Sequence, residues 1–284
     1  GNDPSNTVGA GSNFEAVFMP KPTSVYPEYL PDANVLVCPS DAESDLGTDV
    51  ALDPRCAGFD SSNDGTEAHG VEGCSDNFHD SYMYVGWIYD KIGAVGDPQQ
   101  ATTAKLDVSF GGSGAGIGND EPVPVQSVLA FTKAMVQTFT TDITAYLGGG
   151  GVPALFGDVR SSGRRFDEDV DVNPTNGFNI FAIYEVAPTP GVFYGNGETQ
   201  TMFRLREGVE RFLITDINNP GAASAAQSTL WIMADQISQL PTGFNHIPGG
   251  SNVLYLDGHV AFVRYQDGEP CYRSFASVVE GVQN

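Results

Sequence analysis

The chain has 284 residues, 40% of them hydrophobic, which is enough apolar material for one large domain or one domain with insertions. Its 36 acidic residues outnumber its 13 basic residues, so the net charge is −23. This charge excludes a nucleic-acid or anionic-membrane surface, and no apolar run approaches the roughly 20 residues of a membrane span. The charge either serves solubility alone or is neutralised by divalent cations.

We expect residues 1–19 to form an N-terminal arm and residues 20–284 to form a single domain. The arm is polar up to residue 13, and the sequence FEAVFM at 14–19 is a short strand candidate. The domain carries two insertions, an acidic loop near 41–80 and a loop followed by a helix at 96–150.

Composition and periodicity predict strands at 81–90, 178–188 and 229–235, and a strand that ends in a turn at 34–41. Apolar residues recur at helical spacing from residue 125 to a run of four glycines at 148–151, which ends the predicted helix. Residues 164–177 form a second acidic loop, and the chain ends in a tail that carries Cys271. The sequence therefore predicts an α+β fold, with an antiparallel β-sheet, a packed helix and long acidic loops.

The segment NVLYLDGHVAFVR predicts a β-hairpin. A type I′ turn with Asp257 and Gly258 at its centre is the strongest short hairpin signal. This turn pairs Tyr255 with Val260 and Val253 with Phe262, and it makes both faces of the hairpin apolar. We therefore expect both faces to be covered.

The chain has four cysteines and no C-x-x-C pair, which disfavours a zinc ribbon or a thioredoxin-type site. An even number of cysteines in an acidic, glycine-rich chain favours disulfides and an exported protein. We expect Cys56 to pair with Cys74 and Cys38 to pair with Cys271. Four buried free thiols are the alternative.

Three segments resemble the prepilin-like family. The sequence FNHIPGGSNVLYLDGHVAFV is similar to the family's C-terminal signature, in which nine residues separate a histidine from Asp-Gly; ten separate them here. The segments YPEYLPDANVLVCPSD and REGVERFLITDINNPGAASAAQS are similar to blocks found in planctomycete- and verrucomicrobia-type members. The signature residues are His246, Gly249, Gly250, Asn252, Asp257 and Gly258.

This resemblance implies a pilin-like globular domain that is secreted, non-enzymatic and self-assembling into a filament, tube or surface layer. The sequence given does not contain the family's long N-terminal hydrophobic helix, so either this helix was removed from the chain or the protein works without it. In the second case, we expect the arm to add a strand to a neighbouring copy through Phe14, Val17 and Phe18. The alternatives are an accessory pseudopilin of a secretion system and a calcium-dependent adhesin that binds glycans. In the adhesin, Tyr82, Tyr84, Trp87 and Tyr89 would offer a stacking platform.

Pseudopilins of type II secretion bind calcium in a C-terminal loop, and the acidic loops here suit calcium, which prefers six to eight oxygen ligands. The sequence DEDVDVN places acidic or amide side chains at alternate positions but lacks the glycine and glutamate of an EF-hand. The candidate calcium ligands are Asp167, Asp169, Asp171 and Asn173, then Asp60, Asp64 and Glu67, then Asp41 and Asp45.

The four histidines indicate no catalytic motif, since G-x-S-x-G and H-E-x-x-H are both missing from the sequence. A transition-metal site would need three or four of them to converge. We expect His246 instead to form a hydrogen bond that holds the Gly249–Gly250 loop against the hairpin.

Overall fold

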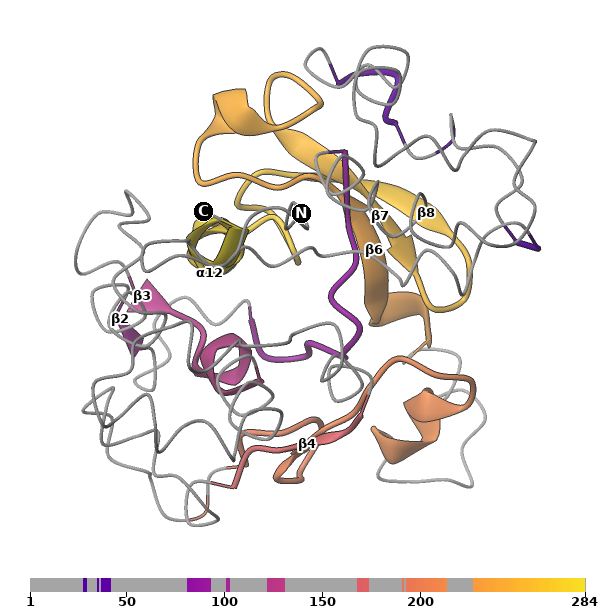
Figure 1. Ribbon diagram of the computed structural model, residues 1–284, viewed down its shortest axis with the longest axis vertical. Helices are drawn as coiled ribbons and strands as arrows, with labels where there is room; N and C mark the ends of the chain where they lie inside the picture. The colour runs from indigo at the N-terminus through magenta and orange to yellow at the C-terminus, as the bar shows by residue number, and fades with distance from the viewer. Residues whose placement is uncertain are drawn as a thin grey trace, which may run out of the picture.

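The computed structural model describes residues 28–29, 35, 37–41, 81–92, 101–102, 122–130, 168–173, 191, 193–213 and 227–283. Their main feature is an antiparallel four-stranded sheet with the order β1-β6-β7-β8 (Figure 1). These strands are β1 (Tyr82–Met83), β6 (Trp231–Asp235), β7 (Gly250–Tyr255) and β8 (Val260–Arg264).

Two small antiparallel sheets accompany the main one: β2 (Ala101–Thr102) with β3 (Pro122–Val123), and β4 (Val170–Asp171) with β5 (Thr201–Met202). The described helices are α12 (Arg273–Gln283), the 3-10 helices η5 (Val209–Phe212) and η6 (Pro241–Gly243), and short helical stretches at 125–130 and 227–229. This confirms an α+β fold with antiparallel sheets. Within the described part of the chain, no helix is long and apolar enough to cross a membrane.

The main core lies between the sheet and α12. The rings of Tyr89, Trp231 and Phe275 meet there, with centroids 5.4 to 6.1 Å apart. Such aromatic pairs add about 0.5–1.5 kcal/mol each beyond the area they bury. Each ring comes from a different part of the chain, so their contact joins the segment after β1, the start of β6 and the C-terminal helix.

Helix α12 replaces the predicted C-terminal tail. Its apolar side chains repeat at intervals of three and four residues, which places them on one face of a helix. That face is fully buried and consists of Phe275, Ala276, Val278 and Val279. The tail prediction was wrong because this stripe is short and no capping residue marks its start.

Three other predicted segments differ locally from the structure. At 34–41, the predicted turn is present, since Asp41 N donates to Cys38 O (2.9 Å), but the described residues before it form no strand and Pro39 has no N–H for a sheet. At 81–90, the strand stops after Met83, and Gly86 has a φ of 75° that interrupts it. The second acidic loop contains β4, and Val170 and Val172 in and beside this strand are buried.

The hairpin of β7 and β8 has a different turn from the predicted one. Gly258 N donates to Tyr255 O (2.9 Å), and Tyr255 N donates to His259 O (3.0 Å), which encloses a three-residue loop. In this loop only Gly258 has a positive φ, of 88°, whereas a type I′ turn needs a second one. The loop is therefore a turn followed by a left-handed glycine, and the strand register moves by one residue.

The shifted register separates the two faces of the hairpin. Leu254 now pairs with Val260 and Val253 pairs with Ala261. Val253 is fully buried on the core side, whereas Val260 and Phe262 on the other side are 61% and 49% exposed. The expectation that both faces are covered was wrong, because the register leaves one apolar face of β8 in solvent.

Gly258→Ala tests the turn. A Cβ at Gly258 would meet no atom within 4 Å, so the cost is that of the left-handed backbone alone, about 1 kcal/mol. Gly258→Asn should cost less, because asparagine tolerates this conformation better. Urea denaturation measures both changes; equal stability of the alanine and parent proteins would contradict the assignment.

Candidate metal centre

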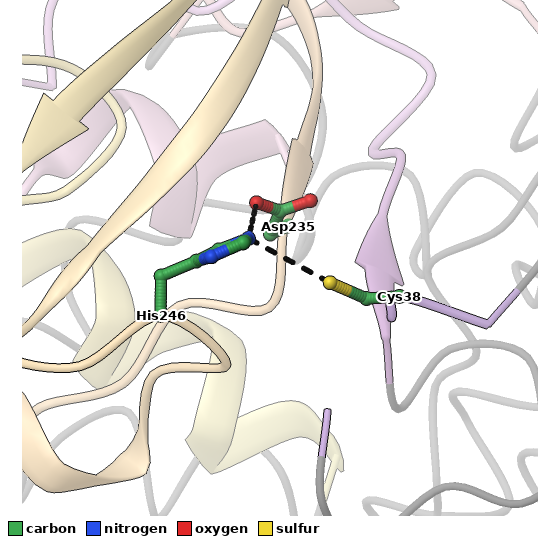
Figure 2. A group of neighbouring side chains, drawn as sticks. All are labelled: Cys38, Asp235 and His246. Carbon is green, nitrogen blue, oxygen red and sulfur yellow. Dashed lines mark hydrogen bonds and ion pairs between the residues drawn. The ribbon is translucent and has the colours of Figure 1, made fainter. Parts of the chain in front are cut away.

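Three side chains from three segments of the chain converge at the C-terminal end of β6 (Figure 2). Cys38 comes from the turn at 37–41, Asp235 is the last residue of β6, and His246 lies in the loop between η6 and β7. One donor atom of each lies within 4.8 Å of the other two. Cys38 and Asp235 are 3% and 4% exposed, so the group is largely shielded from water.

The carboxylate of Asp235 is held by the neighbouring strand. Its Oδ2 accepts hydrogen bonds from the backbone N (2.8 Å) and the side-chain Nδ2 (2.9 Å) of Asn252 in β7. Its backbone oxygen accepts a bond from Ser251 Oγ at 3.1 Å. A buried carboxylate needs such donors because desolvation penalises its charge, and here the pairing of β6 with β7 supplies them.

His246 is placed by a tight turn. Gly249 N donates to His246 O (2.9 Å), and Gly249 has a φ of 124° that favours glycine. The ring Nε2 lies 2.8 Å from Asp235 Oδ2 and 2.9 Å from Asn252 Nδ2. The contact with Asn252 joins the loop to the hairpin, as we expected of His246, but the contact with Asp235 was not expected.

The thiol of Cys38 completes the group, with Sγ 3.6 Å from His246 Nε2. The turn that carries Cys38 is attached to the start of β1, since Ser81 Oγ donates to Asp41 Oδ2 (2.8 Å). Burial, followed by the nearby negative charge of Asp235, raises the pKa of the Cys38 thiol. Without a cation nearby, the thiol therefore keeps its proton at neutral pH.

The predicted disulfide between Cys38 and Cys271 is not present, because both are free buried thiols. Cys38 approaches His246, whereas Cys271 precedes α12 in the main core, where burial raises its pKa to about 12. The even cysteine count suggested disulfides, and this pair was the one left after Cys56 was paired with Cys74. Neither step carries information on the direction of the side chains. Cys56 and Cys74 lie outside the described residues.

The group is not arranged as a Cys-His-Asp catalytic triad. In a triad the nucleophile and the carboxylate contact opposite nitrogens of the histidine ring, so that one orients the ring while the other exchanges a proton. Here Cys38 and Asp235 both approach the same nitrogen, Nε2 of His246. Three donor atoms around one point are typical of an ion site.

Among the side chains predicted to bind calcium, those that the structure describes do not join this group and have partners of their own. Asp169 Oδ2 pairs with Arg206 (3.0 Å), and its Oδ1 accepts from Arg204 N (3.0 Å). Asp171 Oδ1 accepts from Asn173 N (2.8 Å). Asp45, Asp60, Asp64, Glu67 and Asp167 lie outside the described residues, as do Phe14, Val17 and Phe18.

A second polar cluster, which the sequence did not reveal, lies around Asp90. Its two oxygens accept bonds from Gln126 Nε2 (2.7 Å), Asn196 Nδ2 (3.0 Å) and Gly197 N (2.8 Å). The adjacent Lys91 donates to the backbone oxygens of residues 193, 195 and 197 at 2.5 to 2.9 Å. These bonds occupy all three ammonium hydrogens of Lys91. We therefore interpret the cluster as structural, because it fixes the position of the loop before β5.

Comparisons of the chain with known protein families, with curated proteins and with solved structures gave no match.

Asp235→Ala tests the importance of the buried carboxylate. The change leaves Asn252 and His246 without their shared acceptor, which should lower the free energy of unfolding by about 3 kcal/mol. The matched control is Asp257→Ala, which removes the exposed partner of His259 on the hairpin turn and should have a much smaller effect. Urea denaturation at pH 7 measures both; equal losses would contradict the assigned role of Asp235.

Proposed function

We propose that this protein is an extracellular structural subunit of the prepilin-like kind, which self-assembles into a filament, tube or surface layer. The observation that carries the proposal is the exposed apolar face of β8. Val260 and Phe262 lie side by side on this face with the half-buried Leu254, and β8 is the end strand of the described sheet. An apolar end strand is a ready template for a strand from another chain.

The arm of a neighbouring copy is the occupant that we propose for this edge. Residues 14–19 are the right length for a short added strand. In such a strand Phe14 and Phe18 lie on one face, where they can pack beside Phe262, and Val17 lies on the other face. Strand addition draws its affinity from backbone hydrogen bonds and its specificity from alternate side chains. It needs no hydrophobic N-terminal helix.

The accessory pseudopilin is the second candidate, since it would use the same domain without polymerising. The glycan-binding adhesin is weaker, because two of the four rings of its proposed stacking platform are buried, while Tyr82 and Tyr84 are only partly exposed. Trp87 and Tyr89 are 2% and 1% exposed and form part of the main core. A sugar ring could not reach their faces.

We also propose that calcium supports assembly. A chain of net charge −23 repels its own copies, and a bound divalent cation reduces this repulsion. Asp169 is engaged by Arg206, so calcium ligands at 167–173 would have to compete with that ion pair.

Phe262→Lys tests the assembly edge. The substitution should abolish polymers seen by electron microscopy, because a buried lysine at the subunit contact is costly. The monomer should keep its stability within about 0.5 kcal/mol, as is usual for surface substitutions. Phe193→Lys is the matched control, since Phe193 is 46% exposed and precedes β5, outside the four-stranded sheet, and its polymers should persist.

A chain that lacks residues 1–19 should likewise remain monomeric and should bind a peptide of residues 1–19. Polymers formed by the shortened chain would exclude the arm, and polymers formed by Phe262→Lys would exclude β8. A parent protein that never polymerises would favour the accessory pseudopilin.

Calcium has a separate test. Protein passed over a chelating resin should melt at a higher temperature and polymerise more readily when calcium alone is restored. A site filled at a hundredfold excess over Kd adds about 2.7 kcal/mol to the free energy of unfolding. Sodium chloride of matched ionic strength is the control; an equal response to both salts would indicate general screening and no calcium site.

A further inference from the structure

We infer that Cys38, Asp235 and His246 form a binding site for a transition-metal ion of the zinc class. This inference goes beyond the proposed assembly function and does not depend on it. It is carried by the distances between the donor atoms, the hydrogen-bonding conflict at His246 and the chemistry of the three side chains.

The distances between the donor atoms suit a tetrahedral ion. Zinc binds thiolate sulfur at about 2.3 Å and imidazole nitrogen at about 2.0–2.1 Å, which places the two atoms about 3.5 Å apart at a tetrahedral angle. Cys38 Sγ and His246 Nε2 are 3.6 Å apart. The same geometry separates nitrogen and carboxylate oxygen by about 3.3 Å, whereas Nε2 and Asp235 Oδ2 are 2.8 Å apart. A small rotation of the Asp235 carboxylate makes up this difference.

The ring nitrogen of His246 has two contacts that cannot both be hydrogen bonds. Nε2 must carry a hydrogen to donate to Asp235 Oδ2, but it must carry a lone pair to accept from Asn252 Nδ2. Either form of the ring therefore leaves one close contact unfavourable. A cation among the three groups removes the conflict with Asp235, because the lone pair of Nε2 and the carboxylate then both face positive charge. That lone pair then no longer accepts from Asn252 Nδ2, which keeps its bond to Asp235 Oδ2.

The donor set selects the kind of ion. A thiolate and an imidazole favour zinc and similar transition metals, whereas calcium prefers oxygen ligands. Three protein ligands leave a fourth tetrahedral position for water. Asn252 would act as an outer partner, since it donates two hydrogen bonds to Asp235 Oδ2 and so fixes the carboxylate for binding.

The ion would join parts of the chain that are far apart in sequence. Cys38 and His246 are separated by 208 positions, and the turn of Cys38 also contacts the start of β1 through the bond between Asp41 and Ser81. Metal binding to such a group stabilises the folded state directly, because the unfolded chain does not hold the ligands together.

Cobalt and zinc titrations test the site. Untagged, reduced, metal-free protein should bind one Co²⁺ at this group, with the visible absorption of a tetrahedral ion and a thiolate-to-cobalt charge-transfer band, and Zn²⁺ should displace it. Cys38→Ser should remove the charge-transfer band, and His246→Gln should weaken the affinity for Co²⁺ by about 100-fold. Loss of a residue that only supports a ligand already costs up to about this much in metal affinity. Cys271→Ser is the matched control, since it removes the other described buried thiol and should leave both signals unchanged.

Circular dichroism of each variant shows whether it remains folded, and the parent titration decides the question even where a variant does not fold. A parent protein that gives no thiolate-to-cobalt band and no heat with Zn²⁺ would overturn the inference. So would cobalt binding that persists unchanged in folded Cys38→Ser and His246→Gln proteins, because the metal would then be held elsewhere in the chain.

Discussion

The buried carboxylate of Asp235 is the group on which the arrangement of the described sheet depends most. It lies at the end of β6, accepts two bonds from Asn252 in β7, and contacts His246 in the loop that leads into β7. A buried negative charge is stable only where donors surround it. The strand pairing and the position of the loop are therefore fixed together, and Cys38 is brought to the same point.

The turn of the hairpin has a comparable effect on the arrangement of β7 and β8. A three-residue loop in place of a two-residue loop moves the register by one residue, and side chains alternate between faces along a strand. Val253 then faces the core, while Val260 and Phe262 face solvent. The apolar edge that we propose for assembly is thus a consequence of one glycine with a positive φ.

The proposed metal centre and the proposed assembly edge are adjacent. The ring of His246 lies 6.0 Å from that of Phe262, edge to face. An ion that fixes the His246 ring would also limit the motion of the loop beside β8. A strand added to this edge would therefore dock against an ordered surface, which reduces the entropy lost on binding.

The sequence by itself determined the fold class, the hairpin and the strand at β6, because alternating apolar residues and an Asp-Gly turn are local signals. It also pointed to His246 as a residue that holds the Gly249–Gly250 loop. It could not determine the register of the hairpin, since Asp-Gly is compatible with more than one turn. Nor could it assemble Cys38, Asp235 and His246, whose approach depends on the pairing of β1 with β6 and of β6 with β7. Only the tertiary structure decided those features, because contacts between residues about 200 positions apart leave no periodic pattern in the sequence.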